Sequence, residues 1–544
     1  MAGEATGGSS GGTAADPPDV CKQPAPAGEL SAAWQAYVAD SDKHPNIPNV
    51  SFAGYHLGEA ALPKGSGPML DVKQAHGAKG DGQTDDTQAL RAALAAVPEG
   101  GGVVYIPDGE YLLSGPLFVH RSGTIVRGQS RAGTRLRFTR SLEQSYAVNR
   151  KTDTNQSRWS WSGGMIWLGP ESKNTYLSSV GNLSTTFSED WNVGNTLTTI
   201  EPATRGESKL KVASTQGLKA GDYVIVQIDN AADLSVVKHM TGGGAWAEAY
   251  DWSSGNSGRV TTAGTPKINW PVQIASVDGQ QVVLAQPLRF DLRAAWNPKL
   301  CAAGDWLREV GVEQLTVVLG RDYNWSFAAN HNLEPGWNGV WFDNVIDGFL
   351  RAVTVIDADH ALGVSASKNI TLTDFKIDGS NAARRVHHHA TTMRMMSQDI
   401  LWENFEVASQ PFHGINTEGF SMGGVWSKGT LAHGTFDTHR NLPLDCVHTE
   451  ITVNNDGTRG GAADAGPTMG ARFVNWNIDV QNDRAHMITE ANIMPSGALV
   501  GVRGPAVVAA GNSQCLVEAS GETGAVPNPP NLYEAQLRLR LCGP

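Results

Sequence analysis

A repeat of about 24 residues in the second half of the chain is the feature that most restricts its fold. After Val312 the sequence returns to a pattern of alternating apolar residues that ends in a turn. The segments are VEQLTVVLG at Val312, FLRAVTVID at Phe349, ITLTDFKID at Ile370, ILWENFEVA at Ile400, VWSKGTLAH at Val425 and ARFVNWNID at Ala471. If the last interval holds two coils, 122 residues over five coils give the period. Such a period predicts a solenoid.

The length and the glycine content agree with one long solenoid. At roughly 100 to 200 residues per domain, 544 residues would allow three or four domains, but a solenoid grows as a single unit. The 62 glycines are about 11% of the chain, above the usual ~7%, which favours many turns and strands over long helices. The composition therefore argues against a helical bundle.

The segment 71–136 predicts one helix followed by successive strands. Thr84, Asp85 and Asp86 are suited to the first turn of a helix over residues 88–97, and short β runs punctuated by turns follow. The sequence DVKQAHGAKGDGQTDDTQALRAALAAVPEGGGVVYIPDGEYLLSGPL, followed by GTIVRGQ, resembles the opening of the pectate lyase superfamily. The resemblance implies an all-β, single-stranded right-handed parallel β-helix with an N-terminal capping helix. Because the same opening precedes lyases, hydrolases, epimerases and phage tailspikes, it indicates fold more than function.

Six segments are expected along the chain. They are a flexible leader (1–30), an N-terminal extension packed on the solenoid (31–70), the first coils with the capping helix (71–199), a small inserted β subdomain (200–290), the main coils with the site (291–510) and a C-terminal cap (511–544). A short amphipathic helix is expected over residues 31–40, with Trp34, Tyr37 and Val38 on one side. Residues 240–265, rich in Gly, Trp, Ser and Thr, are expected to form either a surface loop that reaches over a cleft or a disordered excursion.

The N-terminal segment and the cysteines are the sequence features that indicate where in or outside the cell the protein acts. Residues 1–20 lack an apolar core, so they predict a flexible leader from a cleaved or engineered start rather than an intact signal peptide. No segment approaches the ~20 apolar residues of a membrane helix. Five cysteines without zinc-type spacing leave two alternatives, a Cys515–Cys542 disulfide or isolated buried thiols. The leader and the family resemblance together favour a secreted, cell-surface or periplasmic bacterial protein.

The charge balance restricts the partners. With 42 Lys and Arg against 54 Asp and Glu, the formal charge of −12 argues against a general binder of nucleic acid or anionic membranes. The resemblance instead implies an extended polysaccharide lying along the coils. It leaves both a monomer and a homotrimer open.

The histidines follow the repeat. Residues one period apart become neighbours at the strand spacing of roughly 4.8 Å, and 25 residues separate His388 from His413, with 26 between His413 and His439. Charged and titratable residues accompany them, namely Arg384, Arg385, Arg394, Glu418, His433, Asp437, Arg440, Asp445 and His448. Convergence of both charge signs on one patch predicts an acid/base site. The alternative is that polar residues stack at coil corners and that His387, His388 and His389 form a solvated loop.

Two reactions differ in the residues they need. β-Elimination of a uronate requires a cation or metal at the substrate carboxylate, a base for the C5 proton and an acid for the leaving oxygen, which suits His and Arg. Hydrolysis requires two paired carboxyl groups. Because the patch is richer in His and Arg, we expect a polysaccharide lyase (a carbon-oxygen lyase) acting on an acidic polysaccharide, with a glycoside hydrolase as the alternative. A non-catalytic glycan-binding or tailspike-like module is the third class.

Residue roles follow from this preference. We expect a base at His413 or His439, substrate-carboxylate binding by Arg440 with Arg394 or Arg385, and an acid or orienting group at His388 or His433. Asp437 would orient His439, or would pair with Glu418 or Asp445 in a hydrolase. Glu418 and His448 are further candidates for substrate binding. The Asn-Thr-Asp and Asp-Asp pattern of polygalacturonases is not reproduced, although His413-Gly414 and His433-Gly434 occur.

Aromatic residues and metals complete the expected site. Trp337 follows Pro335 and Gly336, which predicts a loop and a sugar-stacking platform, whereas Trp402 and Trp426 fall within coil strands. No metal is assigned. Calcium is one alternative, with candidate ligands at Asp343, Asp347, Asp357 and Asp359, and a zinc or copper site among His387, His388 and His389 is another.

Overall fold

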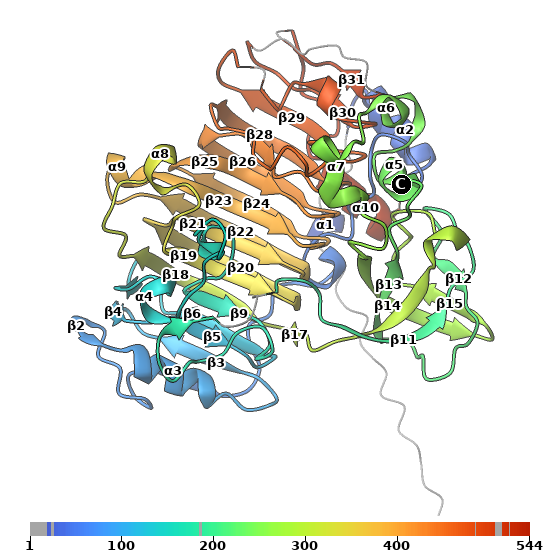
Figure 1. Cartoon of the computed structure of the whole chain (residues 1–544). Coiled ribbons are helices and arrows are strands. Elements are labelled where there is room, and N and C mark those ends of the chain that lie inside the picture. Colours follow the sequence, from blue (N-terminus) through green and yellow to red (C-terminus); the bar gives the residue numbers. More distant parts are fainter. Residues whose placement is uncertain are drawn as a thin grey trace, which may run out of the picture.

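The chain forms a long parallel β-helix, shown by a computed structural model that describes residues 19–22, 27–183, 188–484, 486–505, 514–521 and 523–543 (Figure 1). The main sheet has sixteen strands. Its central path runs through β1 (Met69–Asp71), β3 (Gly102–Ile106), β6 (Thr124–Gly128), β18 (Gly311–Leu319), β20 (Val345–Ile356), β22 (Lys368–Asp378), β24 (Leu401–Val407), β26 (Val425–Gly434), β28 (Val447–Asn455), β29 (Val474–Val480), β30 (Ala498–Val500) and β31 (Leu516–Glu518). Every pairing along this path is parallel, which confirms the predicted fold class.

A second, seven-stranded parallel sheet carries the candidate site. It contains β5 (Leu117–Val119), β9 (Ile166–Leu168), β19 (Asn338–Asp343), β21 (His360–Ser365), β23 (Val386–Arg394), β25 (Gln410–Thr417) and β27 (Phe436–Thr438). Aliphatic and aromatic side chains from both sheets fill one continuous core between them. The alternative of a solvated loop at His387, His388 and His389 is wrong, because all three are buried in β23.

The strand register explains the repeat. The residues in register with Phe349 on the next five coils are Thr371, Leu401, Val425, Val447 and Val474. The final interval therefore does hold two coils, in β28 and β29, and 125 residues over five coils give a mean of 25. The alignment of Ile370 and Ile400 with Phe349 is one residue out, since Ile370 pairs with Gly348.

One helix closes the N-terminal end of the solenoid (Figure 1). The helix α3 (Thr87–Ala95) begins after the N-cap residue Asp86, and the Asp85 carboxylate accepts a hydrogen bond from the Thr87 backbone N–H at 3.0 Å. The buried Leu90 and Leu94, one turn apart, join the solenoid core. The helix therefore covers the N-terminal end of the solenoid core with its buried face, as a capping helix does.

The insertion is a separate antiparallel sheet beside the coils (Figure 1). Its strands are β11 (Val193–Thr199), β16 (Lys299–Ala303), β13 (Tyr223–Ile228), β14 (Ile268–Asp278), β15 (Gln281–Leu284) and β12 (Lys209–Lys211), so it extends beyond the expected 200–290 at both ends. Residues 240–265, expected to be loop, contain α6 (Gly244–Ala249) and α7 (Ser254–Thr261). The insertion shares a hydrophobic core with Met396, Phe420 and Leu444 of the solenoid, which fixes its position.

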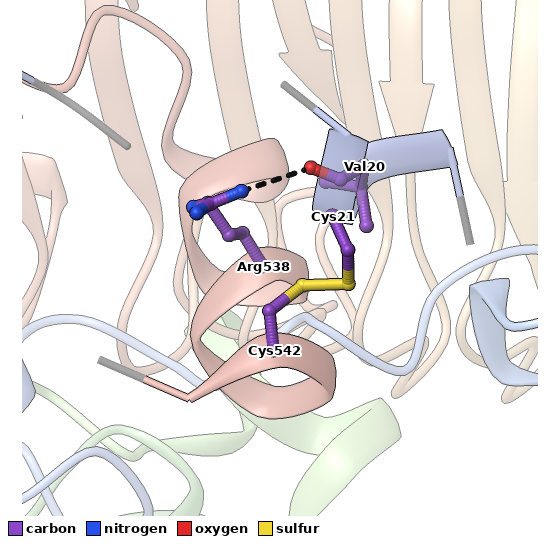
Figure 2. Close-up of a disulfide and its surroundings, with 4 residues drawn as sticks. All are labelled: Val20, Cys21, Arg538 and Cys542. Atoms are coloured by element: carbon purple, nitrogen blue, oxygen red, sulfur yellow. Dashed lines mark hydrogen bonds between the residues drawn. A yellow bond between two sulfur atoms is a disulfide. The ribbon is translucent and has the colours of Figure 1, made fainter. Parts of the chain in front are cut away.

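A disulfide joins the two ends of the described chain. Cys21 in α1 (Asp19–Lys22) is bonded to Cys542 in α10 (Leu532–Cys542), with a Cα–Cα distance of 5.8 Å (Figure 2). The predicted Cys515–Cys542 bond is wrong, because α10 runs back along the solenoid to the N-terminal extension. Part of the expected leader is therefore anchored, while residues 1–18 and 23–26 lie outside the described residues.

The N-terminal extension packs on α10. Trp34 and Tyr37 of α2 (Ala32–Ala39) share a core with Leu532 and Tyr533, whereas Val38 is 39% exposed and does not belong to the packed face. Within the described residues no helix is long and apolar enough to cross a bilayer.

Candidate active site

A pocket of about 770 Å³ lies beside the seven-stranded sheet, at strands β23, β25 and β27. Arg394, His413, Glu418 and His439 come from these strands or the turns that follow them. The remaining walls come from residues 151–162, 188–190, 327–332 and 458–462 and from Arg259 of α7. Distant parts of the chain therefore build the walls around a site carried by the repeat.

Register brings one histidine from each of three coils into a stack. His360 of β21 pairs with His389 of β23, which pairs with His413 of β25, and both steps have ring centroids 4.7 Å apart. His389, not the predicted His388, is therefore the in-register neighbour of His413. His439 follows β27, and its ring lies 4.4 Å from that of His413 and 5.1 Å from that of His389.

Asp437 links His413 and His439. Its Oδ2 lies 2.7 Å from His413 Nδ1 and 3.5 Å from His439 Nδ1, while Asn416 Oδ1 lies 2.9 Å from His439 Nδ1. His413 Nδ1 is also 2.9 Å from the Thr458 carbonyl oxygen. Because all these neighbours are hydrogen-bond acceptors, both Nδ1 atoms carry the proton and Nε2 carries the lone pair in the neutral rings.

The loop after β28 packs directly on these rings. A Cβ atom at Gly460 would lie 2.5 Å from His439 Nε2 and 2.9 Å from His413 Cε1, so only glycine fits here. The Gly460 backbone N–H donates to Asp437 Oδ1 at 2.8 Å. This donor fixes the carboxylate that orients both imidazoles.

His388 lies behind His413, away from the open pocket. Its Nδ1 is 3.0 Å from Glu334 Oε1, its ring stacks on Trp325, and its ring centroid is 5.4 Å from that of His413. Burial lowers the pKa of His360, His388, His389 and His439 well below the usual value. These rings are therefore neutral at pH 7.

Arg394 holds two acidic residues at the pocket. Its Nε lies 3.0 Å from Glu418 Oε1 and its Nη2 lies 3.4 Å from Glu189 Oε2, while Nη1 donates to the Trp161 carbonyl. Burial raises the pKa of Glu189 to about 7 and also raises that of Glu418, with Arg394 opposing both shifts. Since Arg394 is buried and already paired with Glu189 and Glu418, it positions these carboxylates more readily than it could bind a substrate carboxylate.

Four further cations line the pocket. They are Lys151, Arg158, Arg259 and Arg459. Arg259 pairs with Asp464 at 2.9 Å and Arg459 with Glu490 at 3.4 Å, whereas the Arg158 guanidinium has no ion-pair partner within the described residues. Sequence reasoning missed these cations because they lie outside residues 384–448 and no period relates them to the histidines.

Aromatic side chains form part of the wall. Phe327 in α8 (Phe327–Asn330) is 52% exposed and stacks on Phe412 at 4.8 Å and on His331 at 4.3 Å. Trp161 also lines the pocket, and Lys151 Nζ lies 4.9 Å from its ring centroid. The predicted platform at Trp337 is wrong, because this side chain is 3% exposed and belongs to the core.

Several other predicted residues lie outside the pocket lining. Asp437 is buried behind the rings, and Arg440 donates to the Gly466 carbonyl at 3.2 Å. Arg385 pairs with Asp378 at 2.9 Å, and His433 with Asp456 at 2.6 Å. Both side chains are partly exposed, and neither lines the pocket. His448 is buried against Phe436 and bonded to Asn475, so it belongs to the core.

Two groups of side chains in the described residues have metal-ligating atoms close together at this site. One is His388, His389 and His413, the other His413, Asp437 and His439, and in each the atoms lie within 4.8 Å of one another. The four aspartates considered for calcium do not form such a group within the described ranges. Only Asp347 takes part in one, with His56 and Glu309 elsewhere.

Family comparison covers both ends of the solenoid. Residues 70–219 match a family model described as rhamnogalacturonase A/epimerase, pectate lyase-like, and residues 410–544 match a domain of unknown function, DUF4955. The first match confirms the resemblance to the pectate lyase superfamily. The second covers His413, Asp437 and His439.

Curated relatives match over short segments. Alginate lyase 7 of Azotobacter vinelandii is 65% identical over 40 residues, which are 7% of this chain and 5% of that protein. The non-secreted LysM effector LysM19 of Penicillium expansum is 42% identical over 66 residues, 12% of this chain and 5% of that protein. The chain thus spans about 5% of the length of these relatives.

Solved structures match over most of the chain at low identity. The tailspike protein gp49 from Pseudomonas phage LKA1 covers 84% of this chain and 79% of its own, with 13% identity and a TM-score of 0.41. The A-module of the Azotobacter vinelandii mannuronan C-5 epimerase AlgE4 covers the same shares with 12% identity and a TM-score of 0.35. Similarities at this level carry no argument about activity.

Proposed function

We propose that this pectate lyase-like β-helix protein is a polysaccharide lyase that cleaves a uronate-containing polysaccharide by β-elimination. The observation that carries the proposal is the orientation of His439 at the pocket. Its Nδ1 is held by Asn416 and Asp437, which leaves the Nε2 lone pair as the proton acceptor. The coarser conclusion, a polysaccharide-acting protein, agrees with the named activity of relatives such as alginate lyase 7.

The pocket supplies the other groups that elimination needs. In this proposal His439 Nε2 removes the C5 proton, and the electron pair forms the C4–C5 double bond as the C4 oxygen leaves. Arg158, which like Lys151 lines the pocket without an ion-pair partner in the described ranges, binds the substrate carboxylate. Glu189 has its pKa raised to about 7 by burial, so its protonated form can donate to the leaving oxygen.

The test is the chemistry of the products. The purified protein is incubated with polyuronates and with neutral glycans, and unsaturated uronates are followed by their ultraviolet absorbance. Elimination produces this absorbance together with new reducing ends. His439→Ala should lower the rate by about 10²–10⁴-fold, whereas His76→Ala, a histidine far from the pocket in sequence and fold, should not. Equal activity of wild type and His439→Ala would refute the assignment.

A hydrolase is the second candidate, favoured by one observation. Glu189 and Glu418 meet at Arg394 on the pocket wall, so two carboxyl groups are available for general acid and base roles. Hydrolysis would release reducing ends without ultraviolet absorbance. Binding of glycans with neither signal would support the non-catalytic alternative.

The disulfide supports an extracellular or periplasmic location. Cystine bonds persist in oxidising compartments and are rare in the cytosol, so Cys21–Cys542 fits export. Non-reducing mass spectrometry of protein from the native compartment tests this inference.

A further inference from the structure

The buried histidines beside the pocket lack the partners that such groups normally have. Neither the ring nitrogens of His389 nor those of His388 have a hydrogen-bond partner in the part of the chain that the structure describes. His388 Nδ1 lies 3.0 Å from Glu334 Oε1 but not in hydrogen-bond geometry. His389 and His388 are each only 1% exposed. Buried polar atoms in folded proteins are almost always paired, and an exception indicates a bound water or ion.

The three rings are arranged as a ligand set. One nitrogen each from His388, His389 and His413 lies within 4.8 Å of the others. Imidazole–metal bonds of about 2.0–2.1 Å require only that the side chains rotate slightly toward a common centre. Neutral imidazole is the ligand that Zn²⁺, Cu²⁺ and Ni²⁺ share.

The neighbouring acceptors have the positions expected around a metal site. Histidines that bind metals usually donate their second N–H to a carboxylate or a backbone carbonyl. His388 Nδ1 lies 3.0 Å from Glu334, and His413 Nδ1 lies 2.7 Å from Asp437 and 2.9 Å from the Thr458 carbonyl. For His413, Nε2 is therefore the nitrogen available to an ion.

We propose that His388, His389 and His413 bind one divalent transition-metal ion, Zn²⁺ in the first place, at the floor of the pocket. Three protein ligands leave a fourth position, as in catalytic zinc sites. Of the three ligands, His413 lines the pocket, so the ion would lie next to it. A role for the ion in holding the substrate carboxylate rests on the proposed lyase function, whereas the site itself does not.

Metal content tests the site independently of activity. The full chain is purified without metal-chelating resin, and its metals are measured by inductively coupled plasma mass spectrometry. We expect about one equivalent of a transition metal per chain. Protein stripped with a chelator is then titrated with Zn²⁺ against a chromogenic competitor, and Co²⁺ gives visible absorption bands that report its coordination.

Three variants make the test specific. His389→Ala should weaken Zn²⁺ binding by about 100-fold or more, and Glu334→Gln, which removes the carboxylate behind His388, by about 10–100-fold. His448→Ala, a buried histidine of the core, should bind Zn²⁺ like wild type. Circular dichroism checks that each variant is folded. If a variant does not fold, the Zn²⁺ titration of stripped wild-type protein still tests the site.

The outcomes separate the two proposals. Folded, stripped wild type that binds none of Zn²⁺, Co²⁺ and Cu²⁺ overturns the metal site, as does unaltered binding by folded His389→Ala. Elimination activity in metal-free protein would support the lyase function and refute a role for the ion in the reaction. Stoichiometric metal in a protein that forms no unsaturated product would refute the lyase function alone.

Discussion

His413 Nδ1 lies 2.7 Å from Asp437 Oδ2, a contact between neighbouring coils across 24 residues of sequence. Residues one solenoid period apart thus form an oriented imidazole–carboxylate pair. Asp437 also lies 3.5 Å from His439 Nδ1, so a single carboxylate orients the two pocket histidines.

Replacing Asp437 should impair catalysis more than it impairs folding. Asp437→Asn keeps the shape but removes the charge that fixes the proton on both Nδ1 atoms, so we expect the turnover of polyuronate to fall by about 10²–10⁴-fold. The matched control is Asp456→Asn, because Asp456 forms a similar pair with His433 outside the pocket. Initial rates of both variants measure the difference, and equal losses would argue against a specific role for Asp437.

We expect buried Glu189 to make the free energy of unfolding depend on pH. Burial raises its pKa from 4.5 to about 7, so the folded state holds this proton more tightly than the unfolded chain does. The stability it contributes is present below about pH 4.5 and is lost as the pH rises to about 7, by about 3 kcal/mol at most.

Glu189→Gln should remove that share of the pH dependence. Denaturant unfolding at about pH 5 and pH 7.5 should show a smaller difference for the variant than for wild type, since Asp343 and Asp359, whose pKa values are also raised by burial, remain in both. Identical pH profiles would contradict a buried, protonated Glu189.

Phe327 should contribute to glycan binding with little effect on stability. Its side chain is 52% exposed at the pocket wall, so Phe327→Ala removes a stacking surface without opening a core cavity. We expect KM to rise by about 2- to 10-fold, the equivalent of roughly 0.5–1.5 kcal/mol for an aromatic contact. Leu333→Ala, also exposed but not lining the pocket, is the control, and an equal rise there would indicate a nonspecific effect.

The disulfide should stabilise the joined termini. Cys21→Ser should lower the free energy of unfolding by about 2–5 kcal/mol and reduce Tm, because it frees the N-terminal extension from α10. Differential scanning calorimetry measures the change. Cys515→Ser should lower the free energy of unfolding much less. A larger loss for Cys515→Ser than for Cys21→Ser would instead support a disulfide between Cys515 and Cys542.

The site was only partly predictable. The period correctly suggested that His413 and His439 meet, because strand spacing is set by backbone hydrogen bonds. It misjudged the register, because the residue paired with His413 is His389 and not His388, although the His388 ring still lies 5.4 Å from that of His413. Trp337 followed Pro and Gly in sequence, yet the segment folds back so that its ring fills the core.

The sequence by itself determined the solenoid, its N-terminal cap, its insertion and the coils that carry the histidines, because repeated apolar alternation and turn residues are local signals. Only the tertiary structure decided that Arg158, Glu189, Arg259 and Phe327 surround those histidines and that Cys21 meets Cys542. These residues come from segments that no period relates to the coils. Their positions depend on how the insertion, the walls and the two termini pack on the solenoid, which is set by the burial of side chains far apart in sequence.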